Sequence, residues 1–180
     1  MNKALLFAGF VGVFAAASVL AQGAIDFSNI KTAGRPRIFD RDGTTGIAGA
    51  NFLVDILVRN PATGNYEGVT KAGIAYTGVA PLTGANAGLF SGGVLEVPFL
   101  IPGASADVMV RAWDVTSGAT YASAGWKGEV SFSIAALGGA GSPPTLPAVL
   151  ANFSWFVVPE PSSYALAALG LGGLLLFRRK

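Results

Sequence analysis

The sequence predicts an all-β protein: an antiparallel β-sandwich or jelly-roll-like domain, flanked by an N-terminal signal helix and a C-terminal hydrophobic helix. Between residues 25 and 158, several segments alternate apolar and polar residues with a period of two. Gly, Pro, Asn and Asp separate these segments, and none keeps the 3.6-residue period of an amphipathic helix. The longest apolar runs lie at the two ends of the chain. We therefore expect a signal peptide at residues 1–21, a body at residues 22–158 and a C-terminal tail at residues 159–180.

The N-terminal segment has the layout of a secretory signal peptide. Lys3 precedes an apolar run at residues 4–20, and small residues follow. Val19 and Ala21 give a small-residue cleavage pattern before Gln22. The run approaches the length of a membrane span, so an uncleaved anchor helix is the alternative. We expect the body to be exported.

Five segments of the body show the alternation most clearly, and each predicts a strand with one face toward the core. Weaker strands are expected at residues 25–28, 37–39 and 73–77. Parallel strands need long crossover connections, usually helices, and none is indicated, so we expect antiparallel pairing. The residues expected to share a face are Phe52, Val54, Ile56 and Val58; Leu95, Val97, Phe99 and Ile101; Val108, Val110 and Ala112; Val130, Phe132 and Ile134; and Ala151, Phe153, Trp155 and Val157.

Cysteine and histidine are absent from the chain. Their absence excludes disulfide frameworks, Ser-His-Asp and Cys-His catalysis, and the usual zinc and copper sites. Carboxylate chemistry of the glycosidase kind remains, and its candidates are Glu96, Asp107, Asp114 and Glu129. These acids bracket strands or alternate with core residues, where acids usually face water. We therefore predict a protein that is not an enzyme and has no cofactor.

Asp40 and Asp42 precede Gly43 in a segment that resembles the start of a calcium loop. The third acid and the distant Glu of an EF-hand are missing. A β-turn in which Asp side chains cap backbone amides explains the same residues without a metal. The sequence leaves calcium binding open, and we predict no metal site.

Aromatic side chains offer a second kind of candidate site. Trp113 shares a strand face with Arg111, and Trp126 lies in a turn-like segment beside Lys127, so we expect these two to be more exposed than Trp155. Exposed rings of this kind stack on sugars. Trp113 and Trp126 are therefore candidates for glycan stacking, although a Trp on a sheet face is more often covered by a loop.

The net charge of +2 reflects the two ends of the chain. Four of the twelve Lys and Arg residues lie in the terminal segments, which leaves eight cations against nine acids in the body, since Glu160 belongs to the tail. No basic cluster remains there to follow a phosphate backbone, so we expect no nucleic-acid partner.

The C-terminal tail combines three features. Pro159 and Pro161 flank Glu160; each proline fixes its own φ and disfavours helix at the preceding residue, so this step should stand extended. Residues 164–177 are apolar or Gly, but as a helix they span only ~21 Å of a hydrocarbon core of ~30 Å. Three cations follow, and they should remain on the cytoplasmic side. The membrane segment is marked by Tyr164, Leu169, Leu174 and Phe177, and the stop-transfer charges are Arg178, Arg179 and Lys180.

This arrangement resembles the PEP-CTERM sorting tail of Gram-negative bacteria, carried by Pro159, Glu160 and Pro161, the apolar segment and the terminal cations. A plain tail anchor is the alternative, which the short apolar segment disfavours. The resemblance implies recognition and cleavage by a membrane-embedded exosortase after a transient stay in the inner membrane. It also implies delivery to the cell surface or extracellular matrix of an organism that makes exopolysaccharide. We expect a non-enzymatic surface protein; a module that binds exopolysaccharide and a glycosidase are the alternatives.

Overall fold

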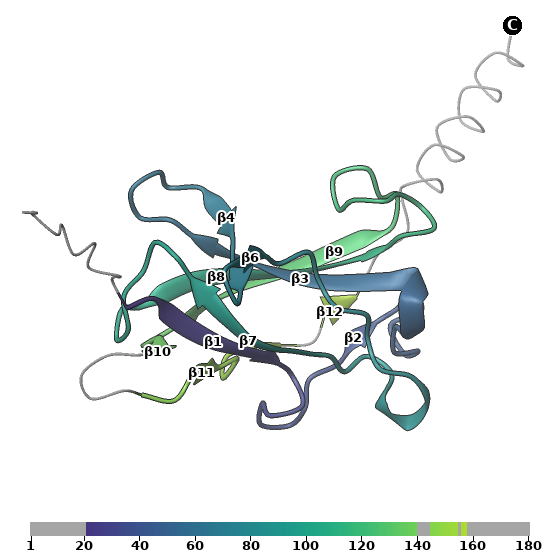
Figure 1. The fold of residues 1–180 in the computed structure, drawn as a ribbon. Coiled ribbons are helices and arrows are strands. Elements are labelled where there is room, and N and C mark those ends of the chain that lie inside the picture. Colours follow the sequence, from purple (N-terminus) through teal and green to yellow (C-terminus); the bar gives the residue numbers. More distant parts are fainter. Residues whose placement is uncertain (1–20, 140–144, 155, 158–180) are drawn as a thin grey trace, which may run out of the picture.

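The computed structural model describes residues 21–139, 145–154 and 156–157, and these are mostly β (Figure 1). No α-helix occurs among them. Two short 3-10 helices, η1 (Gly49–Asn51) and η2 (Gly84–Asn86), lie in connections. The strands are β1 (Gly23–Ser28), β2 (Ile38–Phe39), β3 (Phe52–Arg59), β4 (Tyr66–Gly68), β5 (Thr70–Lys71), β6 (Ile74–Ala75), β7 (Ser91–Val97), β8 (Ala106–Asp114), β9 (Lys127–Ile134), β10 (Gly138–Gly139), β11 (Ala148–Val149) and β12 (Phe156–Val157).

Two larger sheets pack against each other. The β1 sheet has the order β10-β1-β7-β5-β6, with β11 also paired to β1. The β8 sheet has the order β4-β3-β8-β9, and all its pairings are antiparallel. In Figure 1 the β8 sheet lies above β1 and β7, while β2 and β12 form a small sheet of their own.

The predicted alternation is confirmed in the long strands of the β8 sheet. On β3, Val54, Ile56 and Val58 are at most 2% exposed and face the core. On β8, the core residues Val108 and Val110 stand opposite Val58 and Ile56 in the register. These side chains join Ile25, Phe27, Leu95 and Val97 of the β1 sheet in one apolar cluster. Both sheets therefore share a single core. Each sheet turns its apolar face toward the other, as the alternation of apolar and polar residues predicts.

The predicted apolar faces fail at two strand ends. β7 ends at Val97, and Ile101 beyond it is 59% exposed because the chain turns after the strand. The predicted last strand is reduced to the two residues of β12, and Ala151 is exposed while Phe156 is buried. Trp155 lies outside the described residues. In both places the regular strand and the predicted run of apolar residues do not coincide, so the alternation no longer decides which residues are buried.

The expectation of purely antiparallel pairing is wrong at two places. β11 pairs with β1 in parallel, and β12 pairs with β2 in parallel. Each pairing involves only two residues on each strand and joins segments more than 100 residues apart. The two strands of each pair are connected by the long stretch of chain between them, which takes the place of the crossover helix that usually joins parallel strands.

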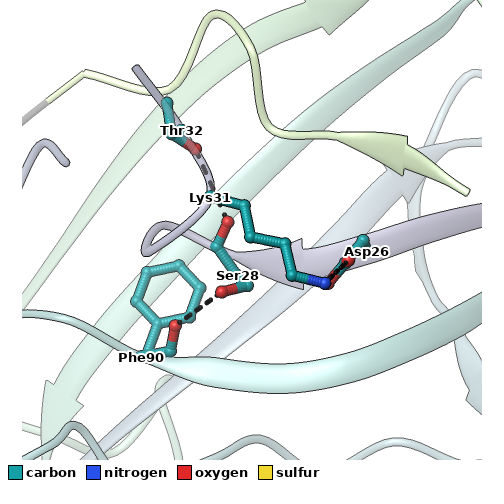
Figure 2. A network of polar contacts seen from close by, with 5 residues as sticks. All are labelled: Asp26, Ser28, Lys31, Thr32 and Phe90. Carbon is teal, nitrogen blue, oxygen red and sulfur yellow. Dashed lines mark hydrogen bonds and ion pairs between the residues drawn. The ribbon is translucent and has the colours of Figure 1, made fainter. Parts of the chain in front are cut away.

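Buried polar groups tie β1 to the neighbouring connections. Ser28 donates to the Phe90 carbonyl (3.3 Å), and Thr32 donates to the carbonyls of Ser28 and Leu150. Figure 2 shows the bonds from Ser28 to Phe90 and from Thr32 to Ser28, together with the ion pair between Lys31 and Asp26. Deeper in the core, Asn29 is fully buried and makes three hydrogen bonds. These bonds satisfy the polar groups where β1 leaves the sheet.

Both predicted terminal helices lie outside the described residues. Within the described part of the chain, no helix is long and apolar enough to cross a membrane.

Candidate functional site

The body and the C-terminal tail meet at β12. Phe156 pairs in register with Ile38 and Val157 with Phe39, so the last described residues are strand residues. Phe156 is buried, and its ring centroid lies 6.1 Å from that of Phe153. Pro159 follows Val157 after one residue. The folded body therefore continues almost to the predicted recognition residues Pro159, Glu160 and Pro161, which lie outside the described residues, as do residues 164–177 and the three terminal cations.

The turn at residues 40–46 lies beside this junction. An added Cβ at Gly43 would stand 4.0 Å from Cγ2 of Val157. Asp42 accepts hydrogen bonds from the amides of Thr44 (2.8 Å) and Thr45 (2.7 Å) and from the Thr45 hydroxyl. These bonds to Thr45 and Thr44 lower the pKa of Asp42 to about 2.

The same carboxylate was a candidate calcium ligand. Its bonds to two backbone amides are those of a capped turn, the alternative drawn from the sequence. Among the residues described, no group of three or more Asp and Glu side chains could hold a metal ion.

A charged row crosses the outer face of the β8 sheet, opposite the core. The register places Asp55 beside Arg111 and Arg111 beside Glu129. Arg111 donates to Asp55 from Nε (2.9 Å) and Nη2 (2.5 Å), a two-pronged pairing of guanidinium and carboxylate. The hydrogen bonds that Arg111 donates to Asp55 raise the pKa of Arg111 despite its partial burial. Side-chain exposures of 20% and 11% show that the pair is largely withdrawn from water.

The connection between β8 and β9 folds back over this row through Tyr121. The Tyr121 hydroxyl donates to Glu129 (2.7 Å), and Arg111 lies over its ring at 4.6 Å. Lys127 holds the same loop by donating to the carbonyls of Tyr121 and Ala122. Burial and the bond to Glu129 raise the pKa of Tyr121, so its hydroxyl is protonated at neutral pH.

A cleft of about 410 Å³, here named the outer cleft, lies between this loop and the sheet. Leu53 and Asp55 of β3, with Arg111 and Trp113 of β8, line it on the sheet side. Trp113 is only 4% exposed, so it is buried under the loop rather than open to solvent; Trp155, with which it was compared, lies outside the described residues. Its ring stands edge-on to that of Tyr121 at 6.1 Å. Trp113 therefore offers little ring surface for stacking.

Two further segments line the outer cleft. Thr77 and Gly78 belong to a segment that follows β6, and next to them Val79 exchanges two backbone hydrogen bonds with Val54 (2.8 and 2.9 Å). Residues 119–121 of the β8–β9 connection line it as well. The cleft thus has a rigid sheet on one side and two anchored loops around it.

Trp126 lies apart from the outer cleft. It is half-buried against the core, and the guanidinium of Arg41 lies 4.6 Å from its ring centroid. One ring face is therefore occupied by a cation from the turn at residues 40–46.

The four candidate catalytic acids are not gathered into one site. Glu96 accepts from the Thr70 hydroxyl and the Gly73 amide in the β1 sheet. Asp114 is buried and caps Thr116. Asp107, which accepts from Ser133, lines a smaller cleft of about 260 Å³ at the far end of β8, and Glu129 binds Tyr121. Each acid has a hydrogen-bond partner of its own within the described residues.

The outer cleft was not predicted from the sequence. Asp55 and Arg111 are charged residues within otherwise apolar strands, and the sequence shows no more of the site than that. Tyr121 lies in a turn-rich segment, and no local pattern shows that this segment folds back over the sheet.

Residues 157–180 match the family described as the PEP-CTERM protein-sorting motif. No curated protein and no solved structure matches the chain significantly. The match covers the Pro-Glu-Pro step, the apolar segment and the terminal cations, the features that carried the resemblance in the sequence. The chain therefore carries a PEP-CTERM protein-sorting motif at residues 157–180, which implies an exported protein sorted by exosortase.

Proposed function

We propose that this protein is a non-enzymatic component of the cell surface or extracellular matrix. A signal peptide at residues 1–21 exports the chain, the body at residues 22–158 is a β-sandwich, and the tail at residues 159–180 delivers it. Exosortase recognises Pro159, Glu160 and Pro161 while residues 164–177 reside transiently in the inner membrane. The terminal cations hold the end of the tail on the cytoplasmic side.

The observation that carries this proposal is the sorting motif, which begins where the last strand of the body ends. The body itself supports a binding or structural role. Its four candidate acids lie apart, and each accepts a hydrogen bond from a neighbouring loop or strand residue. Exosortase, and not the body of this protein, catalyses the cleavage of the tail.

The test replaces Pro159, Glu160 and Pro161 with alanine in a host that carries exosortase. We expect the variant to keep its full mass and stay with the membrane, because the extended proline step no longer fits the enzyme. A matched control changes the neighbouring Ser162 and Ser163 to alanine and should be processed normally. Unchanged processing and surface delivery of the triple variant would contradict the assignment.

Binding of exopolysaccharide is the second candidate function. The observation that favours it is the outer cleft, which combines aromatic, hydroxyl and charged groups on an otherwise regular sheet. The surroundings of Trp113 and Trp126 argue against simple stacking of a sugar on an exposed ring.

A further inference from the structure

The strongest unassigned feature of the body is the outer cleft, lined by β3, β8, residues 77–78 and residues 119–121. Its volume of about 410 Å³ falls within the ~300–1,000 Å³ of small-molecule sites. The smaller cleft beside Arg59 and Asp107 measures about 260 Å³ and falls below that range. Size therefore favours the outer cleft as a ligand site.

A buried donor without an acceptor points to a ligand. Trp113 lines the cleft, and its indole Nε1 is buried without a hydrogen-bond partner among the described residues. A buried N–H left without an acceptor destabilises a fold, so native proteins rarely keep one without a reason. Almost no surface of this nitrogen is open to the cleft, so an oxygen of a bound molecule would satisfy the donor only after the side chains around it shift.

The charges around the cleft indicate that the ligand is uncharged. Arg111 is neutralised by its two hydrogen bonds to Asp55. Glu129 and Lys127, which stand on β9 beyond Arg111 and Trp113, add one charge of each sign. Two cations and two carboxylates leave no net field to favour an anion or a cation.

The remaining lining groups indicate a ligand with both hydroxyl groups and apolar C–H surface. Thr77 and Thr120 bring hydroxyl groups, and Arg111 has N–H groups beyond the two that bind Asp55. Leu53, Ala119 and the aromatic edges provide apolar contact. Sugar rings present hydroxyls at their rim and C–H groups on their faces, which matches such a mixed lining.

We propose that the outer cleft binds an uncharged sugar residue of a glycan, with Arg111 donating to its hydroxyl groups and Trp113 Nε1 doing so once the side chains around it have shifted. This gives a site to the second candidate function above, and it rests on export of the body to a surface where glycans occur. It does not depend on how the tail is cut, so its test has a separate readout.

The test measures sugar binding to the full exported chain, purified in a detergent without a sugar head group because glycosidic detergents would compete. The probes are neutral tetrasaccharides of glucose, mannose and galactose, and a tetrasaccharide of uronic acids. We expect at least one neutral probe to bind, with a change in tryptophan fluorescence, and the uronic acid probe to bind at least tenfold more weakly. Binding of the acidic probe alone, or of no probe, would overturn the proposal.

Variants locate the bound sugar. Trp113→Phe keeps the ring and removes the N–H, so it should weaken binding about fivefold or more, the effect of losing a hydrogen bond to a buried group. Trp126→Phe makes the same change outside the cleft and should leave affinity within about twofold. Thr77→Val changes an exposed lining residue without touching the core, and it should also weaken binding. Equal losses for Trp113→Phe and Trp126→Phe, or none for Trp113→Phe and Thr77→Val, would refute the site.

Discussion

Asp42 shows how a single exposed carboxylate organises the turn next to the sorting motif. Its oxygens accept hydrogen bonds from two backbone amides and one hydroxyl, and these bonds favour the charged form of the carboxylate. The pKa of Asp42 is thereby lowered from 3.8 to about 2. The turn is stabilised by a charge and therefore depends on pH.

Replacing Asp42 with Ala should lower the melting temperature at neutral pH, because two amides lose their acceptor. The pKa of Asp42 is lower in the folded than in the unfolded protein. The carboxylate therefore stabilises the fold fully above about pH 4, and this stabilisation is lost as the pH falls through about 2. The difference in melting temperature between wild type and Asp42→Ala should shrink over that window. Asp42→Asn, which keeps an oxygen acceptor but does not titrate, is the control. A difference that stays constant from pH 7 to pH 2 would contradict this role.

Asn29 is the buried counterpart of Asp42. Its Nδ2 donates to the carbonyls of Pro36 (2.9 Å) and Gly88 (3.1 Å), and its Oδ1 accepts the Phe90 amide (2.7 Å). No other side chain of this size supplies donors and an acceptor in these three directions without a charge.

Asn29→Asp should therefore destabilise the fold by about 3 kcal/mol, because it turns a carboxylate oxygen toward two carbonyls and buries a charge. Urea unfolding followed by tryptophan fluorescence measures this effect. Asn86→Asp is the matched control on an exposed residue of η2 and should stay within about 0.5 kcal/mol of wild type. A loss below about 1 kcal/mol for Asn29→Asp would show that the three bonds are not needed.

At the scale of elements, the short strands β10 and β11 depend on close backbone approach. A Cβ added at Gly138 would overlap the Leu146 carbonyl oxygen, a contact with backbone that a side-chain rotation cannot relieve. Gly138 pairs with Ala24 of β1, and the segment leading to β11 crosses directly over it. The glycine thus allows both neighbours to reach β1.

Gly138→Ala should cost about 2 kcal/mol, the usual effect of overpacking, and should loosen β10 and β11 first. Hydrogen exchange of the β1 amides reports this loosening directly. Gly68→Ala in β4 is the control, since an added Cβ there meets nothing within 4 Å. Equal stability of the two variants would show that the approach at Gly138 relaxes freely.

The elements also show what the sequence could predict. β3 and β8 carry long alternating runs, and their core faces follow from the period of two alone. β10, β11 and β12 have two residues each, too short for any period, and β12 joins β2 across more than 100 residues. The burial of Trp113 depends on Tyr121 reaching back over the sheet, a tertiary contact that local patterns do not encode.

At the scale of the whole molecule, two packed sheets form a body that ends at its sorting motif. Phe156 is buried and packs against Phe153, whose ring also lies 5.8 Å from Phe90. Removing β12 would expose these rings and break the pairing with β2. Processing that leaves the body folded must therefore cut the chain after Val157.

The most direct test of this account is the intact mass of the protein recovered from the surface of its native host. We predict a mature chain that keeps Val157 and lacks residues 164–177. A mass that still includes the terminal Arg178, Arg179 and Lys180, or a chain that ends before Phe156, would contradict it.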